Sequence, residues 1–191
     1  VSRGLGDVYK RQTEDQANVT SELLFDLNSG LPMDRLICGD VGFGKTEVAL
    51  RGAFNVAMSG AQVAFIVPTT LLCSQHYENF TKRFKNFPLK VDQISRLNST
   101  SENNKIIERI NSGESDVVVG THALLNSKIK FKKLGMLIID EEQHFGVSQK
   151  EKIKSLRSNV HVLALTATPI PRTLQMSLVG LRDLSIISTA P

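Results

Sequence analysis

The feature that most constrains this chain is a glycine-rich stretch at residues 39–46, which reads Gly-Asp-Val-Gly-Phe-Gly-Lys-Thr. It matches the P-loop pattern G-x-x-x-x-G-K-T, in which the backbone curls with its N–H groups inward and the next helix adds the positive end of its dipole. An apolar run at residues 35–38 precedes it, and helix-compatible residues 47–58 follow. This strand, turn and helix context argues against the alternative, a chance match in a glycine-rich turn. The stretch predicts a site for a polyphosphate.

Each residue of this motif has an expected part in holding a nucleotide. Gly39, Gly42 and Gly44 would let the backbone close around the phosphates. Lys45 would reach the β- and γ-phosphates, and the hydroxyl of Thr46 would bind Mg²⁺. A nucleotide and Mg²⁺ are therefore the expected ligands.

Length and composition fit one globular domain. The chain has 191 residues, of which 41% are hydrophobic and 22% charged, enough for a single filled core. The net charge of +4 permits nucleic acid as a partner without requiring it. No run approaches the roughly 18 apolar residues of a membrane span and no secretory signal opens the chain, so a cytoplasmic protein without a membrane partner is expected. Cys38 and Cys73 fit no metal or redox spacing and are expected to be buried thiols.

The first twelve residues, VSRGLGDVYKRQ, differ from the rest of the chain. They show no hydrophobic period and carry three basic residues against one acidic residue. We interpret residues 1–12 as a non-native or disordered extension, and a genuine mobile terminus is the alternative. The expected domain therefore covers residues 13–191.

From residue 13 onward, stretches with helical spacing alternate with short, uniformly apolar runs. Such runs are typical of parallel strands that are covered on both faces. The alternation predicts an α/β fold with a mostly parallel sheet, right-handed crossovers and helices on both faces. Helices are expected at residues 13–30, 47–58, 69–86 and 99–112, and strands at residues 35–38, 63–67, 91–95, 116–120, 136–140 and 160–165.

A second polar cluster, Asp140-Glu141-Glu142-Gln143, directly follows one of these strands. Ligands of such sheets bind at the carboxyl ends of the strands, where the P-loop also lies. Asp140 would hold Mg²⁺, commonly through water, and Glu141 would position or deprotonate an attacking water. Glu142 is the next candidate for that base. A solvated acidic turn is the alternative for the tetrapeptide taken alone.

A third polar segment, Thr166-Ala167-Thr168-Pro169, follows the next apolar strand. Its hydroxyl groups would arrive at the same edge of the sheet, within reach of Gln143 or of a water bound to the nucleotide. The same residues also suit a helix start, with Thr168 as N-cap and Pro169 in the first turn. Both interpretations can hold together.

These motifs, in this order, resemble the first RecA-like lobe of superfamily 2 helicases. GDVGFGKTEVALR, VPTTLL, GTHALL, DEEQHFGV and TATPIPRTL are similar to motifs I, Ia, Ic, II and III of the bacterial branch that contains RecG-type helicases and transcription-repair coupling factors. GFGKTEVA, PTTLL, HYENF and LRDLSII resemble the coupling factors more than RecG. The resemblance runs from about residue 13 to the last residue and implies a RecA-like P-loop NTPase fold.

The resemblance also implies roles for single residues. ATP would be the nucleotide, with Gln16 at the adenine edge; Lys45, Glu141 and Gln143 would be catalytic, and Thr46 and Asp140 would hold Mg²⁺. The residues implied to couple ATP hydrolysis to DNA are Thr166, Thr168 and Arg172. Those implied to contact the DNA backbone, through hydroxyls, helix N-termini or charge, are Thr69, Thr70, Ser95, Arg96, Thr121 and His122. Local capping or a solvated surface is the alternative for each DNA contact.

The implied function is that of an ATP-driven double-stranded DNA translocase in transcription-coupled repair. RNA polymerase and excision-repair proteins would be its partners, through regions outside this chain. A RecG-like branch-migrating helicase and a non-catalytic nucleotide-dependent binding module are the alternatives. Superfamily 2 motors have a second RecA-like lobe, and the chain is expected to lack it.

Overall fold

The fold is built on one seven-stranded sheet. The computed structural model describes residues 13–157, 159–171, 173–175 and 182–190, so the suspected extension at 1–12 lies outside the described residues. The strand order is β3-β4-β2-β5-β6-β1-β7, and every pairing between the described strands is parallel. The α/β fold with a mostly parallel sheet is confirmed. The strands are β1 (Asp34–Gly39), β2 (Gln62–Ile66), β3 (Val91–Ile94), β4 (Val117–Gly120), β5 (Leu134–Asp140), β6 (His161–Thr166) and β7 (Asp183–Ile187).

Helices join most of the successive strands, and the first turns of α1, α3 and α4 are capped by short hydroxyl side chains. Thr13 and Ser99 each form a capping box, and the hydroxyl of Thr69 accepts from the N–H of Leu72. The helices are α1 (Glu14–Leu27), α2 (Lys45–Met58), α3 (Thr70–Phe84), α4 (Thr100–Ser112) and α5 (Val147–Leu156), with short 3₁₀ turns η1 (His122–Leu125) and η2 (Glu142–His144). Among the described residues, no helix is long and apolar enough to cross a membrane.

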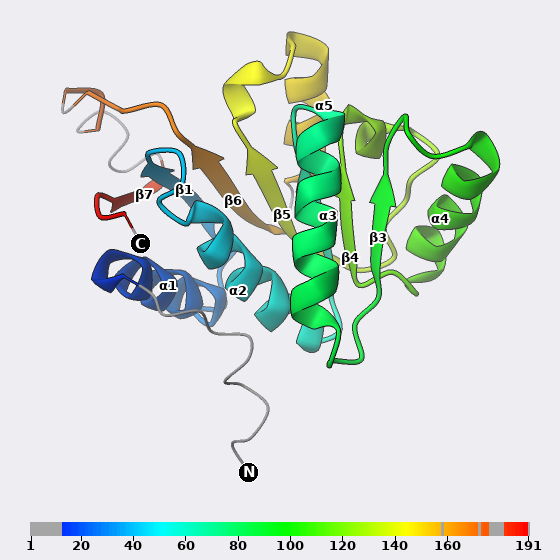
Figure 1. The fold of residues 1–191 in the computed structure, drawn as a ribbon, viewed down its shortest axis with the longest axis horizontal. Helices are drawn as coiled ribbons and strands as arrows, with labels where there is room; N and C mark the ends of the chain where they lie inside the picture. Colours follow the sequence, from blue (N-terminus) through cyan, green and yellow to red (C-terminus); the bar gives the residue numbers. More distant parts are fainter. Residues whose placement is uncertain (1–12, 158, 172, 176–181, 191) are drawn as a thin grey trace.

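The helices cover both faces of the sheet, as Figure 1 shows. On one face, side chains of α1, α2 and α3 such as Leu23, Val48 and Phe80 share a buried cluster with strand residues that include Phe65 and Ile138. On the other face, α4 and α5 pack against the alternate residues of the same strands. The central strands are buried on both faces, which explains why their sequences are uniformly apolar rather than alternating.

Two elements were not predicted from the sequence. Strand β7 alternates buried and exposed residues because, among the described strands, it lies at the edge of the sheet and pairs with β1 alone. Helix α5 has a single buried residue, Ile153, among several lysines, so its apolar period is too weak to recognise.

The expected helix start at residues 168–169 was wrong. Residues 167–171 are not helical, so Thr168 does not cap a helix.

A buried arginine fastens α1 to the edge of the sheet. Arg35 on β1 is 8% exposed. Its guanidinium pairs with Glu22 at 3.0 Å and Asp26 at 2.7 Å on α1, and donates to the hydroxyl of Ser185 on β7 at 2.6 Å. A guanidinium can satisfy several acceptors at once because its donors form a rigid planar fork. This contact sets where α1, and Gln16 with it, lies relative to the P-loop strand.

Replacing Arg35 by methionine is expected to lower the free energy of unfolding by about 1–3 kcal/mol, because the ion pairs of a buried guanidinium are lost. The loss is moderate because the carboxylates of Glu22 and Asp26 are partly exposed and can be hydrated. Urea denaturation of the 191-residue chain measures this change. Lys82→Met on the exposed side of α3 is the matched control and should stay within about 0.5 kcal/mol of the wild type. Equal stability of the two variants would show that this cluster does not hold α1.

Candidate nucleotide site

The P-loop connects the end of β1 to the start of α2. Gly42 and Gly44 have φ angles of +85° and +84°, a region that favours glycine. A Cβ on Gly44 would lie 2.2 Å from Nε2 of Gln16, whereas one on Gly42 would meet nothing within 4 Å. At Gly39, a Cβ would lie 2.9 Å from the carbonyl oxygen of Ile187 on β7. The sequence therefore needs glycine for backbone conformation at two positions and for close packing at Gly39 and Gly44.

Lys45, the first residue of α2, turns back over this loop. Its ammonium donates to the carbonyl oxygens of Gly39 at 2.5 Å and Asp40 at 3.0 Å. Burial lowers the pKa of Lys45, while the nearby carboxylates of Glu141 and Asp140 act in the opposite direction. The cation thus lies on two carbonyl oxygens of the expected phosphate loop, within electrostatic range of the acidic residues at the end of β5.

The acidic cluster is held against the segment that follows β6. Glu141 has a left-handed backbone conformation with φ of 50°. Its N–H donates to the carbonyl oxygen of Leu165, and its carboxylate accepts from the N–H of Ala167 at 2.7 Å and the hydroxyl of Thr166 at 3.2 Å. Bulky residues adopt this conformation rarely, and strained positions of this kind gather at functional sites. The β5–β6 pairing therefore fixes the position of one carboxylate.

Gln143 joins this group. Its amide donates to the carboxylate of Glu141 and, at 3.3 Å, to the hydroxyl of Thr168. The structure thus brings Glu141, Gln143, Thr166 and Thr168 into one hydrogen-bonded set. Arg172, which was predicted to act with the two threonines, lies outside the described residues.

Glu142, the alternative base, has other partners. Its carboxylate pairs with Arg157 at 2.6 Å and with Arg182 at 3.4 Å, and Arg182 pairs with Asp34 at the start of β1 at 2.6 Å. Each carboxylate oxygen of Glu142 therefore has a guanidinium partner, Oε1 with Arg157 and Oε2 with Arg182. These contacts make Glu142 a link between η2, α5 and the strand that leads into the P-loop.

Gln16 lies beside the P-loop and is 3% exposed. Its side-chain amide donates to the carbonyl oxygen of Phe43 at 2.8 Å, and its oxygen accepts from the N–H of Thr13 in the capping box. Both ends of the amide are therefore used within the chain. Reading an adenine edge would require Gln16 to exchange the contact with Phe43 for one with the base.

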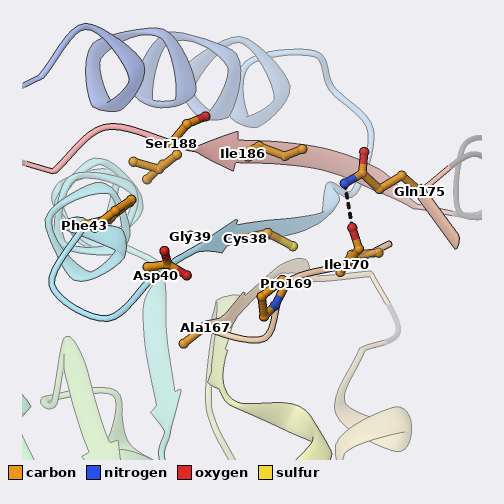
Figure 2. A pocket seen from close by; sticks show the side chains of 11 residues that line it. Cys38, Gly39, Asp40, Phe43, Ala167, Pro169, Ile170, Gln175, Ile186 and Ser188 are labelled. Atoms are coloured by element: carbon orange, nitrogen blue, oxygen red, sulfur yellow. Dashed lines mark hydrogen bonds between the residues drawn. The ribbon is translucent and has the colours of Figure 1, made fainter. Parts of the chain in front are cut away.

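A hollow of about 280 Å³ lies between the P-loop strand and the ends of β6 and β7. Figure 2 shows Cys38 and Phe43 facing it together with Pro169. Its far wall is braced by a hydrogen bond from the amide of Gln175 to the carbonyl oxygen of Ile170. Burial raises the pKa of the Cys38 thiol to about 11, so this cysteine is a neutral apolar lining.

The residues expected to contact DNA follow β2, β3 and β4, at the same edge of the sheet as the P-loop. Their exposure differs. Ser95 and Thr121 are 1% and 2% exposed, and their hydroxyls accept from the N–H groups of Leu97 and Ala123. Both hydroxyls therefore serve local turns.

Their chain neighbours are more accessible. Arg96 is exposed, and its guanidinium lies 3.2 Å from Nε2 of His122. Thr69 is exposed at the start of α3, with Thr70 next to it. Thr69 and Arg96 are exposed and His122 is half-buried, so these three are the ones placed to meet a phosphate, and the buried hydroxyls shape the turns that present them.

One residue of the site had no signal in the sequence. His76 on α3 is 7% exposed, and its Nε2 lies 3.5 Å from a carboxylate oxygen of Asp140. Nothing in its helical spacing indicated that it would meet the end of β5, because this contact depends on how α3 crosses the sheet. Only the assembled fold reveals it.

These residues fit a magnesium nucleotide. The P-loop is open at Gly42, Thr46 is the second residue of α2, and Asp140 is the last residue of β5 at the same edge of the sheet. No cluster of three histidine, cysteine, aspartate or glutamate side chains suited to a metal occurs in the described part of the chain. Mg²⁺ keeps several of its own waters and takes few protein ligands beside substrate phosphates, so one hydroxyl and one carboxylate form a suitable set of ligands.

The fold and this site define a class of protein: a RecA-like helicase domain. Residues 13–177 match the family model for DEAD/DEAH box helicases, so the chain belongs to that family. It is similar to the transcription-repair-coupling factors of Rickettsia bellii (strain RML369-C), at 56% identity over 184 residues, and of Escherichia coli (strain K12), at 55% over 179 residues. Each alignment covers 94% of this chain and 16% of the relative, so the chain spans about one sixth of their length.

Two solved structures are also similar. The structure of RecG bound to a three-way DNA junction has a TM-score of 0.81 and 36% identity, covering 96% of this chain and 24% of that chain. The Pyrococcus furiosus Hef helicase domain has a TM-score of 0.67 and 22% identity, covering 91% of this chain and 37% of that chain, and supports the fold alone. The predicted resemblance to the branch with coupling factors and RecG is confirmed.

Replacing Glu141 by glutamine is expected to preserve nucleotide binding and to slow ATP turnover by about 10² or more, because the amide keeps the shape and loses the proton acceptor. Phosphate release from a longer polypeptide that contains this chain measures it. Glu142→Gln is the matched control, since Glu142 faces Arg157 and Arg182; it should cost stability and leave most of the turnover. A larger loss of turnover in the Glu142 variant would exchange the two roles.

Proposed function

We propose that this chain is the ATP-binding lobe of a double-stranded DNA translocase that acts in transcription-coupled repair. The observation that carries the proposal is the meeting of Lys45, Asp140, Glu141 and Gln143 at one sheet edge, next to the residues that follow β2, β3 and β4. One edge can thus serve both a nucleotide and a phosphate backbone.

In this proposal, each residue contributes one element of ATP hydrolysis. Lys45 supplies positive charge to the β- and γ-phosphates, and Thr46 and Asp140 hold Mg²⁺, which neutralises charge that develops on the phosphate oxygens. Glu141, fixed by Ala167 and Thr166, accepts a proton from the attacking water, and Gln143 connects this carboxylate to Thr168. Gln16 reads adenine by releasing the carbonyl oxygen of Phe43.

The bound nucleic acid would be duplex DNA, held through its backbone. The hydroxyl of Thr69, the first turn of α3 and the charge of Arg96 suit phosphate contacts that are independent of sequence. Thr70 and His122 lie beside them, and Ser95 and Thr121 hold the turns. Movement of residues 166–168 would couple this surface to the nucleotide site, since they contact both Glu141 and Gln143.

RNA polymerase and excision-repair proteins are the partners that the likeness to coupling factors implies, and a protein that works with them acts in the cytoplasm. A RecG-like branch-migrating helicase is the second candidate, supported by the 36% identity to the RecG structure. The identity of 56% to coupling factors favours the first. A non-catalytic binding module is disfavoured, since Lys45, Thr46, Asp140 and Glu141 are all present.

We further propose that residues 13–191 act as one lobe of a two-lobe motor and that residues 1–12 play no part in it. The described residues form a single sheet with a single P-loop. In related NTPases an arginine supplied from another domain raises turnover by about 10³ to 10⁵. The 191 residues by themselves are therefore expected to bind Mg-ATP weakly and to hydrolyse it near the background rate, with little stimulation by DNA.

Two measurements on the 191-residue chain test this proposal. Titration with a fluorescent ATP analogue should show binding that Lys45→Ala abolishes without unfolding the chain, because this lysine supplies charge rather than packing. Phosphate release should stay near background with and without duplex DNA. Unchanged affinity in a folded Lys45 variant would refute the nucleotide site, and robust DNA-stimulated turnover would refute the one-lobe proposal.

A further inference from the structure

A buried histidine lies beneath the carboxylate that is proposed to hold Mg²⁺. His76 is 7% exposed, and its ring centroid lies 4.6 Å from that of Phe65 on β2. Within the described residues, neither ring nitrogen has a hydrogen-bond partner. Buried polar groups are normally hydrogen-bonded because burial without a partner is costly, so an unpartnered imidazole at this place requires an explanation.

The carboxylate of Asp140 lies beside this ring. Nε2 of His76 lies 3.5 Å from one of its carboxylate oxygens, Oδ2, slightly beyond the roughly 2.7–3.2 Å of a hydrogen bond. The backbone of Asp140 is fixed because it pairs with Leu165 at the end of β5. Packing on Phe65 keeps the imidazole beside that carboxylate. A small rotation of the aspartate side chain is enough to bring the two atoms into a hydrogen bond.

We propose that His76 is a positioning residue for Asp140. In this inference, which rests on the proposed function, Nε2–H donates to Oδ2 and fixes the rotation of the carboxylate, leaving Oδ1 to face Mg²⁺ or one of its waters. A free aspartate carboxylate rotates over a broad range, so a hydrogen bond to one oxygen selects a single orientation. Outer hydrogen bonds of this kind orient metal-binding groups and tune their affinity.

The helix that carries His76 gives this contact a further consequence. α3 begins beside Thr69 and Thr70, the proposed DNA contacts, and His76 follows about two helical turns later. A helix moves as a rigid rod over such a length. A shift of its first turn against DNA would therefore alter the distance between His76 and Asp140.

A core histidine that only packs against Phe65 would need no ring N–H, so replacement by phenylalanine separates the two roles. His76→Phe keeps a flat ring and removes the donor. His76→Gln places an amide N–H near the position of Nε2. A positioning role predicts loss in the first variant and recovery in the second, whereas a packing role predicts the reverse.

The experiment measures the dissociation constant of a fluorescent ATP analogue for the 191-residue chain, in excess Mg²⁺ and in EDTA. The ratio of the two constants is the affinity gained from Mg²⁺. His76→Phe is expected to reduce this gain about tenfold, the usual scale for losing an outer partner of a metal ligand, with the constant in EDTA unchanged. His76→Gln should restore most of the gain. His161→Phe is the control, because His161 begins β6 at the opposite edge of the sheet from the nucleotide site. This variant should leave the affinity gained from Mg²⁺ unchanged.

A second measurement needs no substitution. In the ¹⁵N-histidine spectrum of the wild-type chain, Nε2 of His76 should shift with the ATP analogue and Mg²⁺, and not with the analogue in EDTA. A full Mg²⁺ gain in folded His76→Phe, or a His76 signal that does not change with Mg²⁺, would overturn the positioning role alone. No Mg²⁺ gain in a wild-type chain that binds the nucleotide would overturn the proposed Mg²⁺ site as well. A wild-type chain that does not bind the nucleotide would overturn the proposed function, and this inference with it.

Discussion

The parallel pairing of the strands is the constraint on which the rest of the structure depends. Every described strand runs in the same direction, so the segments that follow β1, β2, β3, β4, β5 and β6 all emerge at one edge. Motifs that are far apart in the sequence meet there without any contact of their own to bring them together. The hydrogen bond from the N–H of Glu141 to the carbonyl oxygen of Leu165 shows this directly, since the pairing of β5 with β6 also fixes the carboxylate that we propose as the base.

Polar contacts hold the neighbouring helices and turns against the sheet. On one side, Arg35 joins α1 to β1 and β7, and Gln16 on the same helix reaches the carbonyl oxygen of Phe43 in the P-loop. On the other side, Glu142 connects η2 to Arg157 and Arg182. Lys45 is the exception, because its partners are two backbone carbonyls that a phosphate would replace. The site thus combines a rigid frame with one cation that is free to exchange partners.

The sequence predicted most of this fold because its signals are local. The P-loop pattern, the capped helix starts and the uniformly apolar central strands each depend on neighbouring residues. It did not predict β7, an alternating edge strand, or α5, a polar helix with Ile153 as its buried residue. The contact of His76 with Asp140 was also missed, since it arises from helix packing and leaves no pattern in either segment. Hydrophobic periodicity in the sequence does not predict contacts between side chains of distant segments.

The central claim is that one edge of the sheet binds the nucleotide and that the framework below it stays fixed. Hydrogen–deuterium exchange of the 191-residue chain, with and without Mg²⁺ and a non-hydrolysable ATP analogue, tests it most directly. The account predicts slower exchange at residues 42–46, 141–143 and 167–168, and no change at the opposite edge, at residues 88–90 and 132–133, just before β3 and β5. Protection at that opposite edge, or none in the P-loop, would contradict it.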